Sequence, residues 1–145
     1  MVFSTRRGRF SSESQHLVPS LNDPNAYCAD IYISPRESIS FLLSKDEGAW
    51  IVEVKHNGAH GFNNKVYLPL TFMRHVVKAD GDSEIKQNLD TDTNRLVIKF
   101  TAANLILEED VTDIFGVINH WGRVTIPNRF IPQLKEILSE CISKQ

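Results

Sequence analysis

A six-position pattern that occurs twice constrains the fold of this chain more than any other feature of its sequence. Val-x-Leu-Pro-x-x-Phe-Met-x-x-Val begins at Val66, and Val-x-Ile-Pro-x-x-Phe-Ile-x-x-Leu begins 58 residues later at Val124. In both copies an alternating apolar segment passes through a proline into helical spacing, which predicts a strand followed by a helix. Because three strand-like segments precede each copy, the repetition predicts a duplicated unit of four strands and one helix. The alternative is two unrelated strand-to-helix junctions. The matched positions are Val66, Leu68, Pro69, Phe72, Met73 and Val76 in the first copy, and Val124, Ile126, Pro127, Phe130, Ile131 and Leu134 in the second.

Length and composition predict one soluble domain. The chain has 145 residues, of which 41% are hydrophobic, enough for one sizeable core. No stretch of eighteen apolar residues occurs, and residues 1–15 carry Ser, Arg and Gly where a signal peptide would be apolar. We therefore expect an intracellular protein with no membrane contact, in either the cytoplasm or the nucleus.

The two cysteines predict neither a disulfide framework nor a zinc site. Cys28 and Cys141 are far apart, and neither has metal-ligand spacing around it. We expect both to be reduced thiols, with Cys141 in the core of a helix.

The charge balance argues against binding nucleic acid by bulk electrostatics. The formal net charge is -2, so any such binding requires local patches. One candidate patch is Arg6, Arg7 and Arg9, in a polar segment that we expect to belong to a mobile basic tail over residues 1–26. Such an arm either contacts phosphates or only solubilises the end of the chain.

The order of apolar segments predicts an α+β fold. We expect a single domain over 27–145, built of two tandem repeats (27–79 and 95–145) joined by an acidic linker over 80–94. Antiparallel sheets would carry the helices on their inner face. Thr71 and Asn128 are expected to cap the two helices, and Pro132 to lie in the first turn of the second. The expected strands are 31–34, 38–43, 50–56 and 65–69 in the first repeat, and 95–101, 104–108, 114–120 and 123–127 in the second.

The segment from Trp50 to Leu70 resembles a PUR repeat, the unit of the purine-rich-element-binding proteins. It has an aromatic-led strand, a hairpin containing Gly, Asn and Lys, an alternating strand and then a helix. The resemblance covers roughly residues 27–143 and is best over 49–78. The Whirly proteins and the positive-cofactor-type coactivators share this element order. The resemblance implies a non-enzymatic binder of single-stranded DNA or RNA that acts in transcription or replication, and by the same resemblance a homodimer.

Carried over position by position, the resemblance implies binding residues in the first repeat. Lys45 matches the basic linker position, and Trp50 matches the aromatic at the start of the third strand. Trp50 is either part of the core or a stacking platform. On the opposite parity, the outward residues would be Glu53, Lys55, Lys65 and Tyr67.

The second repeat departs from this pattern. The corresponding linker, 108–113, holds four carboxylates and no base, which should repel phosphates. Its outward candidates are Lys99, His120, Trp121 and Arg123, with Trp121 expected at the tip of a hairpin.

Two other classes of function compete with nucleic-acid binding. The histidines His56, His60, His75 and His120 invite a metal or acid-base interpretation, but no third ligand and no catalytic motif accompanies them. We therefore expect no enzyme activity, no metal and no cofactor. The stronger alternative is a protein-interaction module that docks on a polymerase or a replication factor, and an apolar rather than basic outer face would favour it.

Overall fold

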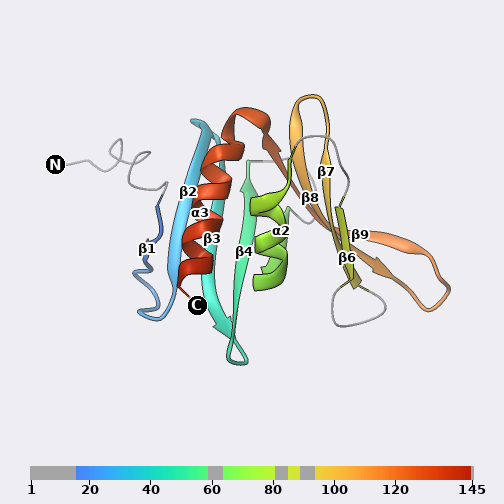
Figure 1. The fold of residues 1–145 in the computed structure, drawn as a ribbon, viewed down its shortest axis with the longest axis horizontal. Helices are drawn as coiled ribbons and strands as arrows, with labels where there is room; N and C mark the ends of the chain where they lie inside the picture. Colours follow the sequence, from blue (N-terminus) through green and yellow to red (C-terminus); the bar gives the residue numbers. More distant parts are fainter. Residues whose placement is uncertain (1–15, 59–63, 81–84, 89–93, 145) are drawn as a thin grey trace.

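The computed structural model describes residues 16–58, 64–80, 85–88 and 94–144, and for residues 85–88, 94 and 120 the description is confined to the backbone. Two antiparallel sheets and two α-helices contribute to one hydrophobic core (Figure 1). The mixed α and β composition expected from the sequence is therefore present. Arg6, Arg7 and Arg9 lie outside the described residues.

The first sheet is a five-stranded antiparallel meander in the order β1-β2-β3-β4-β5. Alternation places Ile39, Phe41 and Leu43 of β3 on the buried face, because successive side chains of a strand point to opposite faces. The four strands expected here are confirmed. The expectation of an irregular segment up to residue 26 is wrong in part, since Val18 and Pro19 pair with Cys28 and Tyr27. The strands are β1 (Val18–Pro19), β2 (Tyr27–Ser34), β3 (Glu37–Asp46), β4 (Ala49–Asn57) and β5 (Lys65–Pro69).

The second sheet has four strands in the order β6-β7-β8-β9, and here the expected boundaries are partly wrong. Its first strand, β6, lies inside the segment expected to be an irregular linker. The segments 114–120 and 123–127 are not two strands, because residues 113–117 form a turn and one strand runs from Ile118 to Pro127. The strands are β6 (Ile85–Asn88), β7 (Asn94–Phe100), β8 (Asn104–Thr112) and β9 (Ile118–Pro127).

A helix follows each sheet: α2 (Leu70–Lys78), and α3 (Ile131–Ser143), which the 3₁₀ turn η1 (Asn128–Phe130) precedes. Both expected caps are wrong. Helix α2 begins at Leu70 directly after Pro69, so Thr71 lies inside the helix rather than at its start. Asn128 instead donates its side-chain amide to the carbonyl of Ala102, at 3.1 Å. Pro132 does lie in the first turn of α3, where a missing amide hydrogen costs little.

The core is continuous across the described parts of both halves. Helix α2 buries Phe72, Met73 and Val76, and α3 buries residues including Leu134 and Cys141, in one cluster with the apolar faces of both sheets. Past the end of α2, Lys135 of α3 donates to the carbonyl oxygen of Ala79 at 2.5 Å. The placement of Cys141 in the helix core is confirmed, and both cysteines are free thiols.

Candidate nucleic-acid interface

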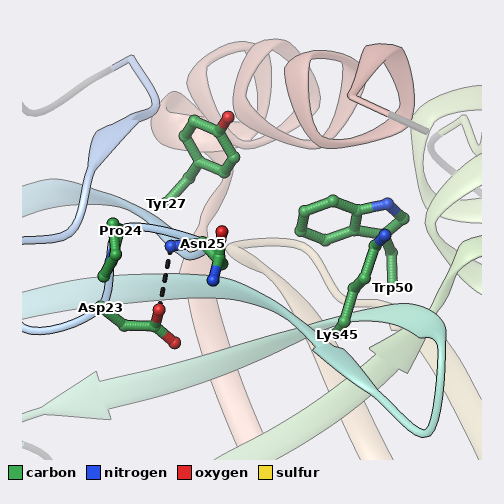
Figure 2. Close-up of a pocket in the computed structure, with 6 residues that line it drawn as sticks. All are labelled: Asp23, Pro24, Asn25, Tyr27, Lys45 and Trp50. Carbon is green, nitrogen blue, oxygen red and sulfur yellow. Dashed lines mark hydrogen bonds between the residues drawn. The ribbon is translucent and has the colours of Figure 1, made fainter.

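An open cavity of about 570 Å³ lies at one end of the first sheet (Figure 2). Two aromatic rings stand on its walls, with their centroids 6.3 Å apart and their planes tilted by 45°. Figure 2 shows the two rings on opposite sides of the same space. The lining residues are Asp23, Pro24, Asn25, Tyr27, Lys45 and Trp50.

A tight hairpin brings Lys45 and Trp50 together. The two are cross-strand partners in β3 and β4, joined through Glu47 and Gly48. Both turn residues have positive φ, 52° and 86°, as a two-residue type I′ hairpin turn requires. The Lys45 ammonium lies 5.3 Å from the centroid of the Trp50 ring, within the range of a cation–π contact.

Trp50 packs against the core and also faces the cavity, so its position fits both alternatives that the sequence left open. Its parity matches Val52 and Val54, so it points to the core side of the sheet, where it packs half-buried against the hydrophobic cluster. It also lines the cavity beyond the end of that cluster. One part of the side chain is therefore anchored while another part faces open space.

The second ring, Tyr27, was missed by sequence reasoning, and so was the lysine that covers it. Tyr27 begins β2, and its ring centroid lies 4.6 Å from the ammonium of Lys144, just past the end of α3. Each aromatic ring of the cavity thus carries one exposed lysine, Lys45 on Trp50 and Lys144 on Tyr27. Tyr27 and Lys144 meet only in the tertiary fold, so no local sequence pattern predicts their contact.

The third wall is the turn between β1 and β2. The backbone amide of Asn25 donates to Asp23 Oδ1 at 2.9 Å, drawn as the dashed line in Figure 2. The backbone amide of Ala26 donates to the carbonyl oxygen of Asp23 at 3.1 Å. These bonds fix Asn25 beside the cavity, where its side-chain carboxamide can both donate and accept.

Lys55, Lys65 and Tyr67 lie on the opposite face of the first sheet, as their parity predicts. Lys55 pairs with Lys65 across β4 and β5, and Tyr67, 40% exposed, pairs with Glu53. The structure therefore does not bring these residues together with Lys45 and Trp50. On the same outer face, Ser40 donates to Asp30 at 2.8 Å, and burial raises the pKa of the Asp30 carboxyl.

Lys99 and Arg123 are held by a buried carboxylate in the second sheet. Lys99 Nζ lies 3.0 Å from Glu108 Oε2, and Arg123 Nε donates to Glu108 Oε1 at 2.7 Å. Although burial raises the pKa of Glu108, the hydrogen bonds and charges of these two cations outweigh it and lower the pKa below the usual 4.5. The expectation that 108–113 is an acidic linker is wrong, because Glu108 and Asp110 are buried members of strand β8.

Trp121 is not at a hairpin tip, as the sequence suggested, but at a β-bulge. Glu109 pairs with Gly122 and Asp110 pairs with His120, so Trp121 is the extra residue between two ladder positions. Its exposed fraction is 60%. A bulge re-aims a side chain without any signal in the alternation pattern, which is why the sequence misplaced it.

The described histidines are engaged in local contacts. His56, mostly buried in β4, lies with Nε2 2.6 Å from Glu37 Oε2, and the exposed His75 meets the ring of Phe72 edge-on. His16 Nδ1 lies 2.8 Å from Glu140 Oε2, with Glu136 nearby, which fastens the segment before β1 to α3. His60 lies outside the described residues, and for His120 the structure describes the backbone alone.

A scan against protein-family models and a search of curated proteins find no match to this chain. Within the described ranges, no helix has the length and apolar character needed to cross a membrane.

Proposed function

We propose that this protein binds single-stranded nucleic acid, DNA or RNA, through the cavity between Tyr27 and Trp50, without catalysing a reaction. The observation that carries the proposal is the pair of aromatic rings, each with an exposed lysine, at one open cavity. Binders of single strands combine stacking platforms with cations that follow the backbone. The cavity supplies both within one site.

The geometry suits a base with its phosphates on either side. A volume of about 570 Å³ lies within the usual range of ligand sites. A base that stacks on Trp50 displaces the ammonium of Lys45 from the ring face, and the flexible lysine stem then turns the charge toward a phosphate. Stacking is worth about 1–3 kcal/mol per base and tolerates any sequence, since every base has a π-face.

The tandem-repeat interpretation belongs to the same proposal. Strands β2 to β5 precede α2, and strands β6 to β9 precede α3. Pro69 and Pro127 occupy equivalent junctions, each the residue before the first helical turn, and Val66 and Val124 are both fully buried. The repeats would place both helices on the inner face of their sheets. The extra 3₁₀ turn after Pro127 shifts the second helix, which is why Phe130 is only half-buried where Phe72 is fully buried.

The two halves would contribute unequally to binding. In the first half, Lys55, Lys65 and Tyr67 offer a second, outer surface for a longer strand. In the second half, Lys99 and Arg123 already neutralise Glu108, so less of their charge is left for phosphates. We therefore place the primary site at the cavity.

A fluorescence titration tests the proposal. Unstructured oligonucleotides are titrated at about 50 mM salt and again at high salt, because phosphate contacts make the affinity fall steeply with salt. In a Trp121→Phe background the fluorescence reports Trp50 alone, since the chain has two tryptophans. Binding with quenching of Trp50 is expected. Binding that leaves Trp50 fluorescence unchanged, or no binding at low salt, contradicts the proposal.

A charge-matched pair of variants tells which face binds. Lys45→Glu with Lys144→Glu reverses two charges at the cavity, and Lys55→Glu with Lys65→Glu reverses two on the outer face. Both variants change the net charge equally, so the general electrostatic effect is shared. The cavity variant should lose more affinity, and the reverse order would move the site to the outer face.

Docking on another protein stays the second candidate. The outer face of the first sheet does not decide the matter, because it mixes exposed Tyr32, Leu42 and Tyr67 with Lys55 and Lys65. The observation that favours a protein contact lies elsewhere, in the hairpin between β8 and β9.

A further inference from the structure

The hairpin between β8 and β9 carries a run of large apolar side chains that the described structure leaves in solvent. Ile114 is 92% exposed and Phe115 is 83% exposed. In Figure 1 this hairpin, in orange, extends away from both helices. Soluble proteins rarely expose a contiguous apolar patch without an interaction to cover it. The apolar residues are Ile114, Phe115, Val117, Ile118 and Trp121, and we call them the hairpin patch.

The turn that presents the patch is fixed by Asp113. Its Oδ1 accepts from the amides of Phe115 and Val117 at 2.9 and 3.0 Å, and its carbonyl oxygen accepts from the amide of Gly116 at 3.0 Å. Gly116 takes a φ of 80°, which a residue with a side chain adopts only with strain. The backbone that carries the apolar side chains is therefore fixed by hydrogen bonds, so little backbone entropy remains to be lost on binding.

The strand edge beside the patch has the bulge at Trp121 as its protection against pairing, which leaves residues 118–120 open to a partner strand. Edge strands are normally blunted by Lys, by Pro or by a bulge. Strand β1 has Pro19, β5 has Lys65 and Pro69, and the sequence of β6 includes Lys86. The stretch 118–121 of β9, Ile-Asn-His-Trp, has neither lysine nor proline, and β9 is last in the order of its sheet.

We propose that the hairpin patch is the contact between two copies of this chain, in which the two β9 strands pair antiparallel about a two-fold axis. A strand edge paired with its own copy is self-complementary, because each residue meets the partner position that meets it in return. The pairing also brings the two hairpin patches alongside each other. It is independent of nucleic-acid binding, since the patch and the cavity share no residue.

The size of the patch fits this occupant. Aromatic side chains bury about 150–250 Å² each, and the patch adds three aliphatic side chains to Phe115 and Trp121. Its area is on the order of the ~800 Å² per partner of a standard interface. The five patch residues are uncharged, and the charged residue of the turn, Asp113, has its Oδ1 engaged by the amides of Phe115 and Val117.

Sedimentation equilibrium of the full chain, from micromolar to sub-millimolar concentration, tests the proposal. The wild type should approach twice the monomer mass, and Phe115→Asp with Ile118→Asp should stay at the monomer mass. Leu21→Asp is the matched control, because Leu21 is fully exposed and apolar but lies in the turn between β1 and β2. It should dimerise like the wild type. Far-UV circular dichroism checks that each variant is folded.

Amide hydrogen exchange of the wild type keeps the test independent of any variant. The amides of residues 118–121 should exchange more slowly as the protein concentration rises, while those of β3 should not change. A wild type that stays monomeric, even if its patch captures a different protein, overturns the proposal. So does a dimer that survives the double substitution, or unchanged exchange at 118–121.

Discussion

Gly122 of β9 lies directly against the backbone carbonyl oxygen of Lys65 in β5, where a Cβ atom would collide with that oxygen. The side chain of Val66 lies 3.5 Å from the same position. The two sheets therefore meet at a point with room for hydrogen only.

Replacing Gly122 with alanine should destabilise the protein, because the backbone of β5 has to move. Overpacking of this kind costs about 1–3 kcal/mol, to be measured as the free energy of unfolding in urea. Gly48→Asn is the control, since nothing lies within 4 Å of that position and asparagine tolerates its positive φ. Equal stability of Gly122→Ala and the wild type would show that the sheets can slide apart at no cost.

Trp50→Leu should weaken oligonucleotide binding more than it weakens the fold. Leucine keeps an apolar side chain against the core but removes the flat ring, so a loss of about 1–3 kcal/mol is expected, roughly 5- to 150-fold in Kd. The same substitution at Trp121 is the control and should leave the affinity unchanged. Anisotropy titrations compare the two variants. An equal loss of affinity in both variants would contradict the proposal that the cavity is the primary binding site.

Glu108→Gln should destabilise the second sheet and change its response to acid. Losing hydrogen bonds to charged groups costs about 1.5–3 kcal/mol, and the lower end applies here because Lys99 and Arg123 are partly solvated. The folded pKa of Glu108 lies below the usual 4.5, so its stabilisation is complete above that value and is lost as the pH falls through the lowered pKa.

Urea unfolding of wild type and Glu108→Gln at pH 7 and pH 3 measures this difference. The gap between the two proteins should narrow at the lower pH, because the Glu108 carboxyl of the unfolded wild-type chain gains a proton below its usual pKa of 4.5. A gap that is the same at both values contradicts the assignment of the ion pair.

Cys141 should resist thiol reagents in the folded protein. Burial raises the pKa of its thiol to about 12, so almost no thiolate exists at pH 8. Cys28 is only half-buried, although burial also raises its pKa. A chromogenic disulfide reagent should therefore modify Cys28 first and reach Cys141 only after unfolding. Cys28→Ser isolates the second thiol, and rapid labelling of that variant in buffer would contradict the prediction.

The first sheet was predictable because its signals are local. Alternation such as Ile39, Phe41 and Leu43 is bounded by Ser-Pro, Asp-Glu-Gly and Asn-Gly breaks, and each break proved to be the end of a strand. The pairing of Lys45 with Trp50 follows from the same signals, since a two-residue turn fixes the register on both sides.

The second sheet was less predictable because the sequence of an apolar segment does not show whether that segment is buried or exposed. Ile114 to Ile118 has the composition of a strand, but most of it forms an exposed turn, and its exposure is a property of the tertiary structure. Strand β6 is only four residues long and lies among acidic residues, so neither its pattern nor its composition separates it from a linker. The contact of Tyr27 with Lys144 joins opposite ends of the chain and has no local signature.

The burial of Glu108 has a consequence for how many ligands one molecule accepts. Because Lys99 and Arg123 share the single carboxylate of Glu108, this cluster keeps one net positive charge, and it offers a polyanion neither of the stacking rings that line the cavity. Saturation should therefore occur at a single oligonucleotide per chain, however symmetrical the order of strands and helices looks.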